Sequence, residues 1–320
     1  MRNGEIGGYF GLECYGAGSY HAGAVELNSG RNALRYLIRA YGIDNIFVPY
    51  FTCPAVWDAL REEGCSIALY NIDDRFMPTA RFPQDAYVLT NDWFGVSGGS
   101  VALLAGKYEN LIVDNAQSFY AEPGGIGSFY SPSKFFGLPD GGLLVCGKRI
   151  EGELPRDASN ERAAHLLKRH DLGAGAGYGD FKANEDLLSK QPVMGMSSLT
   201  RTLMGNIDYA RARRVRLDNF RYLHSELSGI NELDIDEDSI VCPMAYPLLL
   251  SKKGLREKLI ADRIYVARYW DDSGGIVPKG SFSAYLSENL LPLPIDQRYT
   301  PEDMVRVINV IMENLREQEN

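Results

Sequence analysis

Residues 111–146 read LIVDNAQSFYAEPGGIGSFYSPSKFFGLPDGGLLVC. Short apolar runs begin and end this stretch, at 111–114 and 143–146, and such runs between turn-forming residues are typical of buried strands. The first run ends on a carboxylate, Asp114, and Lys134 lies between the two runs among aromatic residues and serines. The stretch therefore predicts two strands of a sheet, with ionisable groups on the loops beside them.

The rest of the N-terminal half alternates between helical and strand patterns. Apolar residues at helical spacing predict helices over 33–40 and 56–63, and short apolar runs predict strands at 46–48, 66–70 and 86–90. Short buried strands separated by helices are typical of a largely parallel sheet that is covered on both faces. Such sheets bind ligands at the carboxyl ends of their strands, which is where the carboxylate described above is expected.

The second half of the chain has a different character. Residues 150–192 are polar and rich in glycine and predict an irregular excursion, whereas 198–227 predicts one or two long helices. A weaker α+β pattern follows, with a strand expected at 264–269, and it ends in a helix. The length of 320 residues allows a division into two domains. We expect an α/β fold with a large, mostly parallel-sheet domain at 1–205 and a small C-terminal α+β domain at 206–320.

Composition limits the class of partner. The formal charge is −9, and a negative field repels nucleic acid and anionic membranes. The basic run at 211–216 is interpreted as a solvated helix face. No apolar stretch reaches the ~20 residues of a membrane helix, and the first residues do not resemble a signal peptide. Five dispersed cysteines and four dispersed histidines predict a reduced, cytoplasmic protein without a metal site.

Lys134 has an unusual setting for a lysine. Two phenylalanines follow it, and a Gly-Gly turn then leads into the next strand. An apolar setting lowers the pKa of a lysine and makes its amine a usable nucleophile for an imine. Three nearby serines, Ser128, Ser131 and Ser133, offer hydroxyls for a phosphate. The alternative interpretation of this segment is a surface lysine in a loop.

A third element is the segment NSGRNAL at 28–34, in which a Ser-Gly turn leads into a helix. A helix N-terminus binds phosphate because it presents free N–H groups and the positive end of the helix dipole, and Arg31 adds a charge there. Asp114 taken alone is equally a turn or helix-cap residue. Together, the helix start, Asp114 and Lys134 match the three needs of pyridoxal phosphate: an anchor for its phosphate, an acid for its ring nitrogen and a lysine for its aldehyde.

On these motifs the chain resembles the DegT/DnrJ/EryC1/StrS family of sugar aminotransferases, which use pyridoxal phosphate and have fold type I. The segment DNAQ at 114–117 resembles the family's D-x-A-Q motif, and 128–142 resembles its S-F…K…G-G segment. Some relatives are dehydratases with a histidine in place of the lysine, and Lys134 argues against that variant. Weaker likenesses lie at 29–34 (SGRNAL), 48–52 (VPYFT), 93–95 (WFG) and 293–295 (LPI).

The resemblance implies a homodimer that transfers an amino group from an amino acid, glutamate in most relatives, to a keto-sugar, in most cases nucleotide-linked. The product would serve a surface polysaccharide or a secondary metabolite. The resemblance also implies that Lys134 forms the internal aldimine and moves protons, that Asp114 pairs with the pyridinium nitrogen, and that Gln117 contacts the ring's hydroxyl or face. The residues implied to hold the phosphate are Ser29, Gly30 and Arg31, with Ser128 or Ser131.

Two features depart from the family pattern. Cys53 occupies the position at which many relatives place an aromatic ring over the cofactor, so Tyr50, Phe51 and Trp93 are the candidates for stacking. The interval from Ser128 to Lys134 is one residue longer than in the family. Ser128 and Ser131 are therefore both candidates for binding the phosphate.

Other functional classes fit less well. The run DLGAGAGYGD at 171–180 invites a dinucleotide-binding assignment, but it has no apolar strand before it and no prompt helix after it, so a flexible loop is expected. No G-x-S-x-G nucleophile elbow is present. The segment at 150–192 is expected to be either a lid over the site or a disordered surface loop. A non-catalytic protein of the same fold that binds sugar nucleotides is the alternative to the enzyme.

Overall fold

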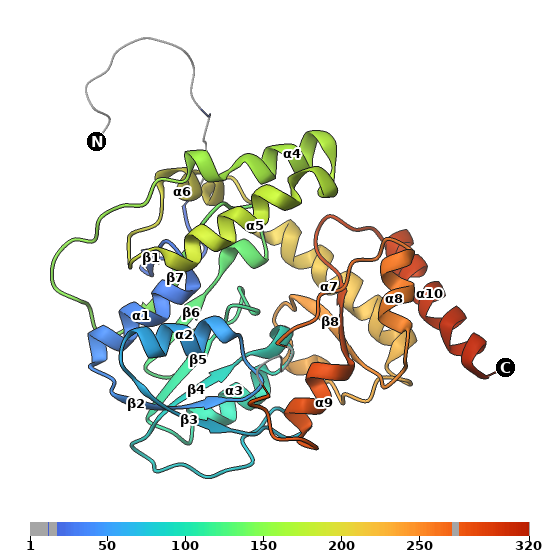
Figure 1. Cartoon of the computed structure of the whole chain (residues 1–320), viewed down its shortest axis with the longest axis horizontal. Helices are drawn as coiled ribbons and strands as arrows, with labels where there is room; N and C mark the ends of the chain where they lie inside the picture. The colour runs from blue at the N-terminus through green and yellow to red at the C-terminus, as the bar shows by residue number, and fades with distance from the viewer. Residues whose placement is uncertain (1–11, 13–17, 271–274, 320) are drawn as a thin grey trace.

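The computed structural model describes residue 12, residues 18–270 and residues 275–319 (Figure 1). Its centre is a seven-stranded sheet with the order β1-β7-β6-β5-β4-β2-β3. Neighbouring strands from β3 to β6 are parallel, whereas β7 is antiparallel to both of its neighbours. The predicted, mostly parallel sheet is confirmed. Its strands are β1 (Val25–Leu27), β2 (Asn45–Pro49), β3 (Ser66–Tyr70), β4 (Tyr87–Asn91), β5 (Asn110–Asp114), β6 (Gly127–Tyr130) and β7 (Gly142–Cys146).

Both faces of this sheet are buried, and successive residues of β5 show it. Ile112 packs into a core with α1 (Gly30–Tyr41) and α2 (Pro54–Glu62), whereas Val113 packs into the core on the other face, together with α3 (Gly98–Ala105). Alternate residues of a strand point to opposite faces, so a strand covered on both sides must be apolar throughout. This burial explains the uninterrupted apolar runs of the sequence, and it leaves the strand ends as the place for polar groups.

The segment at 150–192 is largely helical, which corrects the expectation of an irregular excursion. It forms a hairpin of α4 (Ala164–Leu172) and α5 (Ala174–Lys190), and Figure 1 shows the two helices packed against each other. Gly173 separates them with a φ of 90°, a positive value that glycine adopts without strain. The glycine-rich run at 171–180 therefore ends one helix and begins the next, and the expected flexible loop is wrong.

One glycine of α5, Gly177, allows the two helices to pack closely. A Cβ at Gly177 would lie 2.7 Å from the carbonyl oxygen of His165 in α4, closer than such atoms approach in proteins. Glycine costs about 1 kcal/mol relative to alanine inside a helix, which is why a glycine-rich run argues against a helix on local grounds. Here the close contact between two backbones requires glycine and offsets that cost.

The C-terminal part packs long helices on a two-stranded antiparallel sheet of β8 (Ala245–Leu249) and β9 (Leu290–Pro294). Residues 264–269 have no regular secondary structure and pair with no strand of the described chain, so the strand expected there is wrong. The helices are α6 (Ser198–Gly205), α7 (Tyr209–Leu227), α8 (Leu255–Ala261), α9 (Phe282–Asn289) and α10 (Pro301–Glu319), and the 3₁₀ helices of the chain are η1 (Trp93–Gly95), η2 (Pro132–Lys134), η3 (Asn160–Arg162) and η4 (Glu237–Ser239).

One hydrophobic core runs from the sheet into the C-terminal part, since Trp93 of the sheet region belongs to the same cluster as Tyr246 of β8 and Leu293 of β9. The proposed boundary at residue 205 stays a prediction. Among the helices described, none has the length and apolar character needed to cross a bilayer.

Candidate active site

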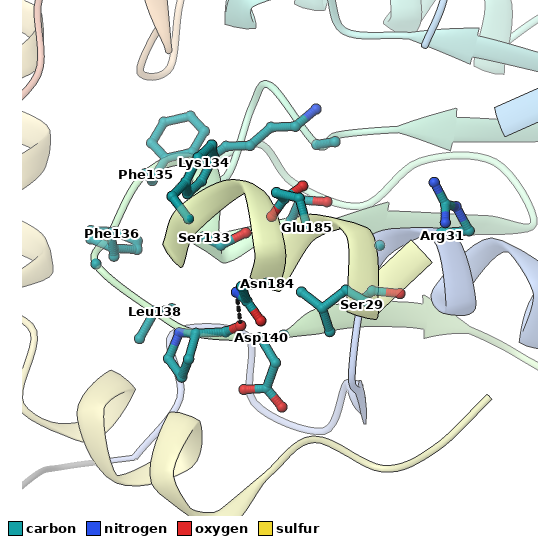
Figure 2. Close-up of a pocket in the computed structure, with 18 of the residues that line it drawn as sticks. Ser29, Arg31, Ser133, Lys134, Phe135, Phe136, Leu138, Asp140, Asn184 and Glu185 are labelled. Carbon is teal, nitrogen blue, oxygen red and sulfur yellow. Dashed lines mark hydrogen bonds between the residues drawn. The ribbon is translucent and has the colours of Figure 1, made fainter. Parts of the chain in front are cut away.

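A cavity of about 900 Å³ opens beside the carboxyl end of β5. The parts of the chain that line it include the start of α1, the segment from Ser131 to Gly141, the α4–α5 hairpin, the C-terminal part, the start of α2 and the end of β5. Figure 2 shows the first three of these parts, with Lys134 on its loop, Ser29 and Arg31 at the start of α1, and Glu185 on α5. The carboxyl edge of the sheet is thus the place where segments distant in the sequence meet.

Asp114 is the last residue of β5 and is 4% exposed. Its carboxylate accepts hydrogen bonds from Asn91 Nδ2 at 3.1 Å and from the backbone N–H of Ala116 at 2.9 Å. Burial raises the pKa of Asp114, and the charge of Lys134 and the N–H of Ala116 oppose that rise. Within the described chain no cationic side chain lies within 4 Å of this carboxylate, so it faces the cavity without a counter-ion in contact.

Lys134 ends η2, and its side chain is exposed to the cavity. The next residue is clamped: the carbonyl oxygen of Phe135 accepts from Arg216 Nη2 at 3.1 Å and from Gln297 Nε2 at 2.8 Å. The guanidinium of Arg216 also lies 4.5 Å from the centre of the Phe135 ring. The side chain of Lys134 is therefore exposed to the cavity, while the backbone beside it is held by residues of the C-terminal part.

The start of α1 and Ser131 meet at one end of the cavity. Ser29 caps the helix, because its Oγ accepts from the N–H of Asn32 at 3.1 Å. Gly30 lies so close to Ser131 that any side chain at position 30 would overlap the serine hydroxyl. Arg31 donates to the carbonyl oxygen of Ser189 at 2.6 Å, and its buried Nε has no hydrogen-bond partner among the described residues.

Ser128 is not part of this arrangement. It is fully buried in β6, and its hydroxyl accepts from the N–H of Gly124 at 2.8 Å and donates to the carbonyl oxygen of the same residue at 3.0 Å. Its hydroxyl is therefore used within the loop that precedes β6. Of the two rival serines, the structure brings only Ser131 to the cavity.

Gln117 lies outside the cavity lining. Its Oε1 accepts from the backbone N–H of Phe94 at 2.9 Å, and its buried Nε2 has no partner in the described chain. Phe94 needs such support because its φ of 56° is unusual for a residue with a side chain. Gln117 thus holds the turn at Phe94, and its expected contact with a cofactor ring stays a prediction.

The three aromatic candidates for stacking do not line the cavity either. Trp93 and Phe51 are buried in the core and are joined by a hydrogen bond of 2.9 Å from Trp93 Nε1 to the carbonyl oxygen of Phe51. Tyr50 is half-buried and also lies outside the cavity lining. Cys53 itself does line the cavity.

Tyr269 is the aromatic residue that the sequence analysis missed. It enters the cavity from the C-terminal part and packs edge-on against Phe94, with ring centres 5.7 Å apart. Burial raises the pKa of Tyr269, and the charge of Lys134 opposes that rise. The apolar run at 264–269 was the only signal in the sequence, and it is equally typical of an ordinary strand.

Hydrogen bonds tie the α4–α5 hairpin to the loop that carries Lys134. Asn184 of α5 donates to the carbonyl oxygen of Pro139 at 2.7 Å, and Arg162 donates to Asn184 at 3.4 Å. Arg162 forms a buried ion pair with Asp157 at 2.6 Å. We call α4 and α5 the roof of the cavity, and we call Asp114, Lys134, Ser131 and the start of α1 its floor.

The carboxylate of Asp140, beside Pro139, makes a second connection, from the lysine loop to α6. It accepts from the N–H and the hydroxyl of Ser197, at 3.0 and 2.9 Å, and from the hydroxyl of Thr200. Burial raises the pKa of Asp140 to about 6, and the hydrogen bonds from Ser197 limit the rise.

No model of a known protein family matches the chain, and no curated protein matches it. Solved structures do match. A DegT DnrJ EryC1 StrS aminotransferase from Brucella abortus has 17% sequence identity and a TM-score of 0.61, over 91% of this chain and 85% of that chain. DesV from S. venezuelae has 21% identity and a TM-score of 0.60, over 91% and 84%.

A third structure, the E. coli GDP-4-keto-6-deoxy-D-mannose-3-dehydratase with bound hydrated PLP, has 16% identity and a TM-score of 0.63, over 90% of this chain and 87% of that chain. At these identities the likeness shows the fold. The chain has the α/β fold of the pyridoxal-phosphate-dependent aminotransferases, and the fold class predicted from the sequence is confirmed.

Proposed function

We propose that the protein is a pyridoxal-phosphate-dependent aminotransferase that moves an amino group from an amino acid, expected to be glutamate, to a keto-sugar linked to a nucleotide. The observation that carries the proposal is the convergence of Asp114 and Lys134 on one cavity that the start of α1 also lines. A fold shared with sugar aminotransferases supports the same proposal.

The floor residues fit pyridoxal phosphate. Asp114 is a buried carboxylate with a raised pKa and no cation in contact among the described residues, and a protonated ring nitrogen would supply the missing partner. At the other end, a helix N-terminus, the Ser131 hydroxyl and the unpartnered Nε of Arg31 form a donor set that suits a phosphate.

When bound, pyridoxal phosphate supplies an electron sink that lets a proton and an amino group leave an amino acid. Asp114 would hold a proton at the ring nitrogen. Lys134 would carry the cofactor and then take a proton from the substrate carbon and return it. The backbone beside it is held by two hydrogen bonds and its side chain is exposed to the cavity, an arrangement that suits both tasks. The phosphate would be held by Ser29, Gly30, Arg31 and Ser131.

We also propose that the protein is a cytoplasmic homodimer. Four large apolar side chains of the roof are more than half exposed, and burial against a second copy would remove them from water. The four cysteines whose state is described are free thiols, which suits a reducing compartment. We place the reaction in the synthesis of a polysaccharide or a secondary metabolite. The exposed side chains are Leu167, Leu172, Tyr178 and Leu187.

The second candidate is a sugar-nucleotide binding protein without catalysis. It is favoured by Cys53, which lines the cavity at the place where relatives carry an aromatic ring. The two candidates differ in whether amino nitrogen is transferred.

The test is transfer of ¹⁵N from labelled glutamate to a panel of nucleotide-linked 4-keto-6-deoxyhexoses, followed by mass spectrometry. The panel contains GDP-, dTDP- and UDP-linked sugars. Labelled amino-sugar formed by the wild type and absent from a Lys134→Ala variant is the expected result. Binding of a panel member without any label transfer would favour the second candidate instead.

A further inference from the structure

The cavity has one wall that the reaction proposed above does not use, the inner face of α5. Phe181, Asn184, Glu185 and Leu188 all line the cavity, and their spacing of three, four and seven residues places them on one face of the helix. Asn184 fixes this face relative to the lysine loop through its bond of 2.7 Å to the carbonyl oxygen of Pro139. Glu185 is the next residue, so its position relative to Lys134 is also fixed.

Glu185 differs from the other acidic residues of the cavity. Asp114 is bonded to Asn91, Asp140 to Ser197, and Asp296 to Arg298 at 2.6 Å. No hydrogen bond or ion pair joins the carboxylate of Glu185 to another residue of the described chain. In Figure 2 its side chain leaves α5 on the side of the lysine loop. An acceptor without a partner, on the wall of the cavity that also contains the reactive lysine, has the position of a substrate ligand.

The chemistry of Glu185 suits the sugar part of the acceptor substrate. An ionised carboxylate only accepts hydrogen bonds, so it suits groups that donate them, such as sugar hydroxyls. Glutamate, the expected amino donor, has no hydroxyl groups. Phe181, one turn earlier on the same face, adds an apolar surface for the C–H groups of a sugar ring.

We propose that Glu185 is a specificity-determining residue that binds hydroxyl groups of the keto-sugar and has no part in recognising the amino donor. This inference rests on the proposed function, and it assigns the roof to the acceptor substrate and the floor to the cofactor.

Two variants, Glu185→Ala and Glu185→Gln, test the assignment against a matched control, Asp186→Asn. Asp186 is the next residue of α5, is exposed and lies outside the cavity lining, so its substitution removes the same charge from the same helix. The donor reaction is followed as the change in cofactor absorbance on adding glutamate. Acceptor affinity is measured by calorimetry in a Lys134→Ala background, with the sugar of the panel that the wild type converts fastest.

Glu185→Ala is expected to weaken sugar binding and to lower kcat/KM for the sugar by about 10- to 100-fold, as loss of a hydrogen bond to a charged group predicts. Glu185→Gln is expected to lower sugar affinity and kcat/KM by a smaller factor. Asp186→Asn is expected to change both by less than about twofold. The donor reaction should keep its rate in all three variants. If the wild type transfers nitrogen but Glu185→Ala leaves the sugar affinity unchanged, the inference about Glu185 is overturned and the proposed function is not. A wild type that neither responds to glutamate nor converts any sugar overturns the proposed function, and the inference with it.

Discussion

The floor and the roof of the cavity differ in how their residues are buried and held in place. Floor residues lie at the end of a buried strand and the start of a buried helix, and Asp114 is held there by two hydrogen bonds. The roof is a helical hairpin with exposed apolar side chains, and it is tied to the lysine loop and to Arg162 through Asn184. Groups that act on a cofactor need a rigid setting, whereas a hairpin outside the sheet can change without disturbing it.

The largest effect is expected from Asp114→Asn, which should disable the floor and leave the roof intact. An amide cannot hold the proton that the ring nitrogen needs, so kcat should fall by roughly 10³-fold, which is about 4 kcal/mol. Steady-state kinetics with glutamate measures the loss. The sugar affinity of the same variant, measured by calorimetry, should be unchanged, and a parallel loss of sugar binding would contradict the separation of the two regions.

Arg162→Ala should instead disturb the roof and leave the floor intact. The substitution leaves Asp157 buried without its partner and removes a bond to Asn184, so we expect the free energy of unfolding to fall by about 3 kcal/mol. Urea denaturation measures this change. KM for the sugar should rise while cofactor absorbance persists. Arg156→Ala, which alters an exposed arginine nearby, serves as the control and should change stability by less than about 0.5 kcal/mol.

Asp140 should make the stability of the structure depend on pH. Its pKa is about 6 in the folded protein and close to its ordinary value of 3.8 in the unfolded chain. The folded state therefore binds more protons between these values, so the free energy of unfolding should fall as pH rises from about 4 to 6, by at most about 3 kcal/mol. Urea denaturation across this range checks the sign. An Asp140→Asn variant should lack this part of the slope, and an equal slope in the variant would exclude Asp140 as its source.

The smallest effects come from two glycines of the roof that differ only in their surroundings. A methyl group at Gly177 would press on the carbonyl oxygen of His165, so Gly177→Ala should lower the free energy of unfolding by about 1–3 kcal/mol. Gly179 has open space around it, so Gly179→Ala should raise stability by about 0.5–1 kcal/mol through its helix propensity. Thermal unfolding of the two variants tests whether α5 is a helix packed against α4. Equal effects of the two substitutions would contradict that packing.

The floor could be predicted from the sequence because its charged residues stand where charged residues are uncommon. A carboxylate that closes an apolar strand and a lysine among aromatic residues are both unusual, and the carboxyl edge of a parallel sheet brings them together. Ser131 could not be separated from Ser128 in this way. The choice depends on which hydroxyl forms hydrogen bonds with the loop before β6, and in the structure that hydroxyl belongs to Ser128.

The roof and Tyr269 could not be predicted for a different reason. Their positions depend on contacts between distant segments and not on local pattern. The glycines of α5 oppose a helix on local propensity, and the close approach of α4 explains one of them, Gly177. Tyr269 lies in a segment without regular secondary structure, and its place in the cavity follows from the packing of the C-terminal part against Phe94.

The central claim is that Lys134 binds pyridoxal phosphate on the floor of the cavity. The most direct measurement is the absorbance spectrum of the purified protein with added pyridoxal phosphate, beside Lys134→Ala and a control, Lys182→Ala, which removes an exposed lysine of α5 outside the cavity lining. We predict a visible band of lysine-bound cofactor that glutamate bleaches in the wild type and in the control and that is absent from Lys134→Ala. The same band in all three proteins, or in none of them, would contradict the claim.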